Sequence, residues 1–241
     1  MSVADKLTTI AANTPKLYKA GKDAIWDAIQ DGGDRLIYDR AFSYSKWNSD
    51  TFKPKHNISP TSAKELFRMT KVGDDTTKKI DLIKLEEETG FKLDFSNCND
   101  IRYAFADCGC FSTVGEVDLR KCTAGESTLL AFYGGYGGSS KTEIKKIICD
   151  ENTYFHTETF NYLNHLQEIR FEGTIGTKGT NGMLFSRSTK LSHESLMSII
   201  NALQDLSGTD ITRSIVLGTT NLAKLTDAEK AIATERGWTL A

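Results

Sequence analysis

The chain has 241 residues, of which 39% are hydrophobic and 26% charged, and its formal net charge is −2. It is long enough to bury a sizeable core in one or two domains, and its balanced charge argues against a disordered chain or a nucleic-acid binder. Neither a secretory signal nor a run of about 18 apolar residues is present. We therefore expect a soluble, cytoplasmically made product without membrane insertion. Five cysteines, an odd number, favour buried thiols over a disulfide framework.

The first thirty residues carry an apolar stripe with close to a heptad period. Its members are Val3, Leu7, Ile10, Leu17 and Ile25. The stripe predicts a helical attachment segment over residues 1–30, which binds other copies of the chain or a larger particle. The alternative is a helix that packs on the first repeat and covers the open end of the core.

A repeat becomes visible beyond these residues. KLDFSNC (92–98) aligns without a gap with EVDLRKC (116–122), a period of 24 residues from cysteine to cysteine. An aromatic landmark follows each segment, first Phe105 and then Phe132. Further units read KKIICDEN followed by FNYLNHL, EIRFEG followed by MLFSRSTKL, and then SIVLG. The pattern predicts one short strand per unit and a stack of units.

Period-two alternation within each strand separates inward from outward side chains. The predicted inward residues are Leu93, Phe95, Val117, Leu119, Ile147, Cys149, Ile169, Phe171, Ile215 and Leu217. Since one unit cannot bury its inner face alone, the units are expected to stack into a solenoid with a continuous parallel sheet on one side. The outward residues Asp94, Asp118, Arg120, Ile148 and Arg170 then align on the sheet face, where we expect a partner to bind. A plain solvated face is the alternative.

The glycine-rich stretch GGYGGSSKT invites comparison with a phosphate-binding loop. Gly135 and the pair Lys141 and Thr142 fit that motif, but Ser140 stands where the second glycine is required. The following EIKKIICDEN indicates a strand, whereas a phosphate-binding loop leads into a helix. We interpret the stretch as a loop of the repeat and expect no nucleotide or other cofactor.

Towards the C-terminus a helix is predicted to replace a strand. Apolar residues recur at helical spacing in residues 192–208, with Ser192 as N-cap and Gly208 as the stop. A last helix is expected to begin at a capping box of Thr226 and Glu229 and to end at Gly237.

Trp238 and Leu240, which follow this last helix, are expected to close the open end of the core.

The remaining sequence patterns give only weak indications of a metal site or a catalytic site. Cys108 and Cys110 lack the second spaced pair of a zinc site, and the cysteines at 98 and 122 recur at one repeat position, as packing residues do. The histidines show no ligand spacing, and no Gly-x-Ser-x-Gly elbow occurs. The acidic run from Asp81 to Glu88 is interpreted as a solvated face. We predict no catalytic residue, no metal site and no enzymatic activity.

Two segments carry a family resemblance. The repeat units resemble the irregular leucine-rich repeats of BspA-like bacterial surface proteins, and residues 41–69 and 191–241 are similar to the lead-in and closing segments of such proteins encoded by phages and prophages of gut Firmicutes. The resemblance implies an α/β repeat, an irregular leucine-rich-repeat solenoid with an N-terminal helical segment and C-terminal capping helices. Its expected organisation is an attachment segment at 1–30, a connector and N-terminal cap at 31–75, and the solenoid with its C-terminal cap at 76–241.

The same resemblance implies a phage structural protein, tail-associated or on the virion surface, that binds virion proteins and a host-surface protein or glycan. A bacterial interaction or adhesion module outside a virion is the alternative. Neither interpretation implies a cofactor. The phage protein is expected in the virion, and the alternative location is the cytoplasm.

Overall fold

The computed structural model describes residues 38–54, 56–72, 77–134, 142–179 and 181–241. They form a mixed α/β structure with parallel sheets and few helices, and these residues include no closed barrel. The stripe residues Val3, Leu7, Ile10, Leu17 and Ile25 and most of the glycine-rich loop lie outside the described residues.

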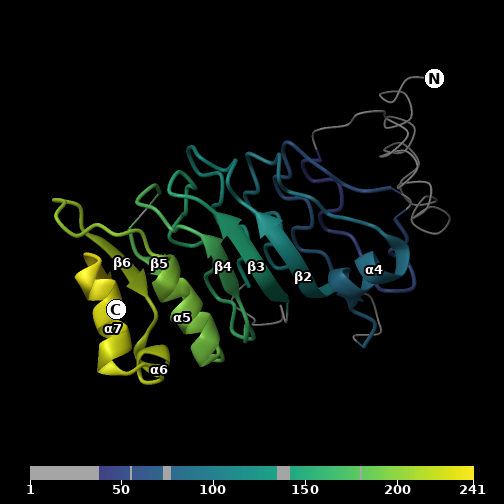
Figure 1. Ribbon diagram of the computed structural model, residues 1–241. Coiled ribbons are helices and arrows are strands. Elements are labelled where there is room, and N and C mark those ends of the chain that lie inside the picture. The colour runs from purple at the N-terminus through teal and green to yellow at the C-terminus, as the bar shows by residue number, and fades with distance from the viewer. Residues whose placement is uncertain (1–37, 55, 73–76, 135–141, 180) are drawn as a thin grey trace.

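The strands form two parallel sheets in chain order. The first contains β1 (Ile80–Asp81), β2 (Phe111–Asp118), β3 (Glu143–Cys149) and β4 (Arg170–Gly173). The second contains β5 (Met183–Leu184), β6 (Arg213–Val216) and β7 (Trp238–Leu240). Every neighbouring pair is parallel, and Figure 1 shows β2, β3 and β4 side by side with α5 next to them. Within each sheet, every strand is therefore added beside the one before it, as the repeat predicts.

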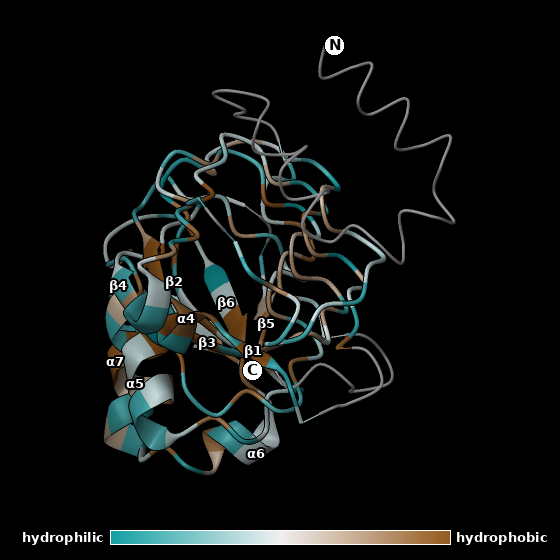
Figure 2. Cartoon of the chain, turned by 90° about the vertical axis from the view of Figure 1, so that its right-hand side faces the viewer, coloured by the Kyte–Doolittle hydropathy of each residue, from teal (hydrophilic) through white to brown (hydrophobic). Residues whose placement is uncertain are grey.

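The inward set is confirmed with one exception. Phe95, Val117, Leu119, Ile147, Cys149, Ile169, Phe171, Ile215 and Leu217 are buried, and Leu93 is half-buried. One hydrophobic core extends from Tyr38 to Trp238, so the described part of residues 31–75 shares it with the repeat region. Figure 2 shows the stack end-on, with brown, hydrophobic stretches both on strands and on the turns beside them.

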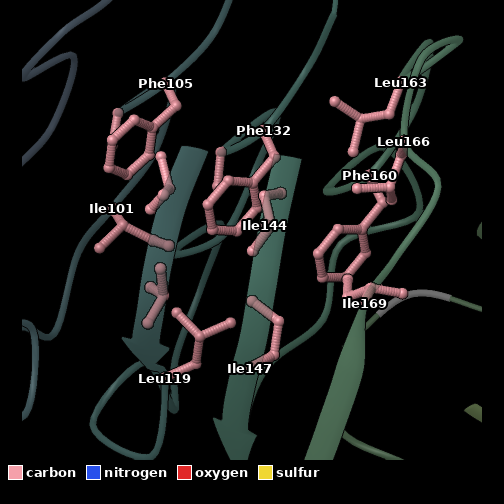
Figure 3. Packing of buried hydrophobic residues seen from close by; sticks show 14 of the residues in the cluster. Ile101, Phe105, Leu119, Phe132, Ile144, Ile147, Phe160, Leu163, Leu166 and Ile169 are labelled. Atoms are coloured by element: carbon pink, nitrogen blue, oxygen red, sulfur yellow. The ribbon is translucent and has the colours of Figure 1, made fainter. Parts of the chain in front are cut away.

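Six phenylalanine rings form a column through this core. They are Phe42, Phe67, Phe105, Phe132, Phe160 and Phe185. Successive ring centroids are 5.1 to 5.7 Å apart, with interplanar angles of 4° to 26°. Figure 3 shows three of these rings beside the strands of the first sheet. Since each aromatic pair contributes about 0.5–1.5 kcal/mol beyond its buried area, this phenylalanine column stabilises the stack along its length.

The backbone around the column repeats as well. The N–H of Phe67 donates to the carbonyl of Ala104 at 2.7 Å, and the N–H of Phe105 donates to the carbonyl of Ala131 at 2.8 Å. Two residues before each of the first four phenylalanines, a residue other than glycine adopts a positive φ of 52° to 59°. These residues are Arg40, Glu65, Tyr103 and Leu130. A left-handed residue of this kind costs about 1–2 kcal/mol, which the hydrogen bonds between successive units offset.

Helix α4 (Leu82–Thr89) follows β1 directly. The side chain of Asp81 caps it by accepting hydrogen bonds from the N–H groups of Ile83 and Lys84, at 3.0 and 3.2 Å. It ends at Gly90, whose φ of 74° is a left-handed conformation that glycine adopts without strain. The acidic residues at 86–88 are exposed, as expected for a solvated face.

Helix α5 (His193–Ala202) takes the place of a fifth strand beside β4, which confirms the predicted replacement. Ser192 is its N-cap, as expected. The hydroxyls of Ser195 and Ser198 accept hydrogen bonds from the N–H groups of Ile169 and Phe171, at 3.0 and 2.8 Å. Serine side chains thus satisfy strand N–H groups that would otherwise lack a partner.

The helix is shorter than predicted, because it ends at Ala202 and not at Gly208. At Leu203 the backbone becomes extended and forms a bridge with Ile175. The N–H of Ile175 donates to the carbonyl of Ala202, and the N–H of Gln204 donates to the carbonyl of Ile175. Pairing with a neighbouring segment therefore ends the helix before its apolar pattern does.

The C-terminal part contains α6 (Thr219–Leu222) and α7 (Asp227–Glu235). The predicted capping box of Thr226 and Glu229 is present at the start of α7. Beyond it, Trp238 is only 4% exposed, and its indole N–H donates to the carbonyl of Gln204 at 2.8 Å. Trp238 thus belongs to the core at this end, as expected, and Leu240 is partly buried against the core.

Candidate functional site

The outer face of the first sheet carries a row of charged side chains from neighbouring strands. Lys146 of β3 contacts the carboxylate of Glu116 on β2, and its Nζ lies 3.1 Å from Oε2 of Glu172 on β4. The hydrogen bonds to Glu116 and to Glu172 raise the pKa of Lys146 above its ordinary value. Exposed ion pairs of this kind contribute at most about 1 kcal/mol to stability. The row therefore adds little to the stability of the fold.

Asp118 and Arg120 form a bidentate pair at the end of β2. Nε of Arg120 lies 3.0 Å from Oδ1 of Asp118, and Nη2 lies 2.6 Å from Oδ2. Burial acts to raise the pKa of Asp118, but the hydrogen bonds and charge of Arg120 outweigh it and the pKa is lowered. Asp118 is on the outward side, as predicted, yet its side chain is only 7% exposed because Arg120 covers it.

A hollow of ≈ 430 Å³ lies beside this pair. Its lining residues are Leu82, Ile83, Glu86, Phe91, Lys92, Leu93, Asp94, Phe95, Ser96, Val114, Gly115, Glu116, Asp118, Arg120 and Ile148. Its walls are therefore α4, the segment 91–96, and the second half of β2 with its neighbours. The volume falls within the range of about 300–1,000 Å³ that is usual for ligand pockets.

The hollow lies at an interruption of the sheet. β1 pairs with β2 only through Ile80 with Phe111 and Asp81 with Thr113, after which the chain leaves the sheet as α4. It returns as the segment 91–96, and no backbone hydrogen bond within the described chain joins that segment to β2. The repeat alignment predicted a continuous sheet here, and this prediction is wrong because, among the described residues, the segment bridges only to Ile58 on its far side and forms no backbone pairing with β2.

The structure brings four of the five predicted face residues together. Asp94, Asp118, Arg120 and Ile148 all line the hollow. Arg170 is exposed on β4, opposite Lys146 in the sheet register, and lies on the same face without lining the hollow.

The sequence reading missed the contribution of α4. One wall of the hollow is apolar and consists of Leu82, Ile83 and Phe91. It was missed because the acidic residues of the same run were interpreted as a solvated face. A side chain at Gly115 would place its Cβ 3.2 Å from Cγ1 of Ile83, so glycine permits the helix to lie close to β2. The signal available in the sequence was an apolar pattern at 82, 83 and 85 that ended at a glycine.

The described part of the glycine-rich stretch does not resemble a phosphate-binding loop. Thr142, which would hold magnesium in such a loop, is buried, and its Oγ1 lies 3.1 Å from the carbonyl oxygens of both Cys108 and Phe111. The chain then continues directly into β3 and not into a helix. The interpretation as part of the repeat agrees with this geometry.

The cysteines serve packing. All five are buried, and burial raises the pKa of Cys98 and of Cys149 to about 12. The Sγ atoms of Cys108 and Cys110 are 3.7 Å apart, and Thr70 lies against both. Within the described ranges no group of three or more potential ligands is arranged to hold a metal ion.

Compared with known proteins, the chain matches no family model, no curated protein and no solved structure. Among the residues that the structure describes, no helix has the length and apolar character needed to cross a membrane.

Proposed function

We propose that this chain is a non-enzymatic binding protein that uses the outer face of its first sheet, together with the adjoining hollow, to hold a protein partner. The observation that carries the proposal is the convergence of Asp94, Asp118, Arg120 and Ile148 on one hollow beside an exposed charged row. Charged side chains held in a fixed order across parallel strands provide the electrostatic complementarity that gives an interface its specificity.

The architecture we propose for this role is an irregular leucine-rich-repeat solenoid. Support comes from the parallel strands added in chain order within each sheet and from the turn that repeats before the first four rings of the phenylalanine column. Stacked repeats present extended surfaces of this kind to partners. The resemblance to BspA-like proteins of phages suggests the setting, a virion-surface or tail-associated protein, with a bacterial interaction module as the second candidate.

Site-specific photo-crosslinking tests the binding face. A crosslinking amino acid replaces Glu172, which is exposed on β4, and in a matched control it replaces Asp210, an exposed residue in a distant loop. We expect a discrete adduct with one partner protein only from position 172, and loss of that adduct when Arg170→Glu is added. Equal crosslinking from both positions, or none from position 172, would refute the face as the binding site.

A separate experiment decides between the two settings. After lysis of a producing culture, density-gradient centrifugation separates particles from free protein, and an antibody locates the chain. Co-sedimentation with the particles supports the virion protein. Recovery only among free proteins favours the bacterial interaction module.

A further inference from the structure

An unpaired strand edge lies on one side of the hollow. The segment 91–96 pairs on its far side with Ile58, whose N–H donates to the carbonyl of Lys92 at 2.9 Å and whose carbonyl accepts from the N–H of Asp94 at 2.8 Å. Alternate residues of a strand direct their backbone groups to opposite sides, so those of Leu93 and Phe95 are directed away from Ile58. Within the described residues, the N–H groups of Leu93 and Phe95 have no hydrogen-bond partner.

The opposite side of the hollow has an unpaired edge as well. β2 pairs with β3 from Thr113 to Asp118, but on its other edge it pairs with β1 only as far as Thr113. From Val114 onwards, this second edge has no partner strand among the described residues. An open edge of this kind is a template for an added strand, and it supplies affinity through main-chain hydrogen bonds.

The side chains of the hollow define what would fit it. Ile83 and Ile148 are half-buried at the hollow, so part of their apolar surface is available to a ligand, whereas Val114 and Phe91 lie buried behind it. Four carboxylates line the hollow against the two cations Lys92 and Arg120.

Three of these carboxylates already have ion pairs, Glu86 with Lys92, Glu116 with Lys146, and Asp118 with Arg120.

Asp94 is the exception. Its carboxylate accepts a hydrogen bond from the N–H of Ser96 at 2.8 Å, and no cation of the described chain lies within ion-pair distance. The side chain is half-buried at the hollow. Charge complementarity therefore favours a ligand that brings its own basic group.

We propose that the hollow binds an extended segment of the partner protein, which pairs with the open edge of β2 and places a lysine or arginine against Asp94. The inference rests on the proposed function, because the hollow borders the same sheet face, and it specifies the partner's chemistry. An alternating segment with apolar side chains towards the wall and a basic residue at its centre fits both the edge and the charge.

The test uses the full chain and a library of random peptides displayed on yeast. Selected peptides are resynthesised in two forms, one unmodified and one with alternate backbone amides N-methylated, and their affinities are measured by fluorescence anisotropy. Asp94→Asn removes the charge but keeps an oxygen that accepts from Ser96, so the local turn is preserved. Asp210→Asn, in a distant exposed loop, is the matched control.

We expect the selected peptides to be enriched in basic residues flanked by β-branched ones. Both N-methylation and Asp94→Asn should weaken binding at least about tenfold, since each removes main-chain or charge-assisted hydrogen bonds. Asp210→Asn should leave affinity unchanged. Binding that is insensitive to N-methylation or to Asp94→Asn, or a library that yields no binder, would overturn the inference. The crosslinking from position 172 would then show separately whether the sheet face still binds a partner.

Discussion

Replacing Phe132 tests whether the phenylalanine column stabilises the fold. Its ring is 2% exposed and lies 5.6 Å from that of Phe105 and 5.5 Å from that of Phe160, nearly parallel to both. Truncation of a buried phenylalanine to alanine costs about 3–5 kcal/mol. Phe132→Leu keeps most of the apolar volume but loses two ring contacts, each worth about 0.5–1.5 kcal/mol, so we expect a cost of about 1–3 kcal/mol.

The matched control is Phe95→Leu. Phe95 is 1% exposed and belongs to the same core, but it lies outside the column, and within the described residues its one ring contact is with Phe105 at 5.8 Å. Urea denaturation followed by circular dichroism and by tryptophan fluorescence gives the free energy of unfolding, and coincidence of the two curves checks two-state behaviour. Phe132→Leu should destabilise the chain more than Phe95→Leu, by about the value of one ring contact. An equal or smaller effect, or a cost below about 1 kcal/mol for Phe132→Ala, would refute the role of the column.

Three further predictions concern other parts of the structure. Ser195→Ala and Ser198→Ala should each cost about 1–3 kcal/mol, because each leaves an N–H of β4 or its approach without its acceptor, and unchanged urea midpoints would contradict this. Arg120 lowers the pKa of Asp118, so the ionised Asp118 carboxylate stabilises the folded state. This contribution to the free energy of unfolding is fully present above the ordinary aspartate pKa of about 3.9 and is lost as the pH falls through the lower pKa of the folded state. The difference in urea midpoint between the wild type and Asp118→Asn should therefore shrink below about pH 4, and a difference that stays constant in acid would argue against the pair. At neutral pH none of the five buried cysteines should react with a thiol reagent until the chain is unfolded, and rapid labelling of the native protein would show that the core is open.

Local sequence patterns predicted the features of the fold that depend on residues close together in the chain. Alternation identified the inward side chains of β2, β3, β4 and β6, and capping residues located the starts of α5 and α7. These features follow from the period of a strand or from the first turn of a helix, so a short window of sequence contains them.

What the sequence could not supply was the choice of partner for each strand. The segment 91–96 has the same alternation as β2, and only the three-dimensional arrangement shows that it pairs with Ile58. The first two members of the phenylalanine column were missed for a related reason. Phe67 and Phe105 are 38 residues apart, whereas the other intervals are 25 to 28 residues, so a fixed period does not connect them.

In the phenylalanine column, the number of residues between two rings does not determine the distance between those rings. Neighbouring rings stay 5.1 to 5.7 Å apart although the number of residues between them varies. The longest interval, from Phe67 to Phe105, contains α4 and the segment 91–96, and so it contains two walls of the hollow. Since doubling a loop costs only about 0.6 kcal/mol, extra residues can be accommodated between rings at little expense. The hollow is thus an insertion in an otherwise regular stack, and the remaining intervals are positions where a new specificity can be grafted while the scaffold is retained.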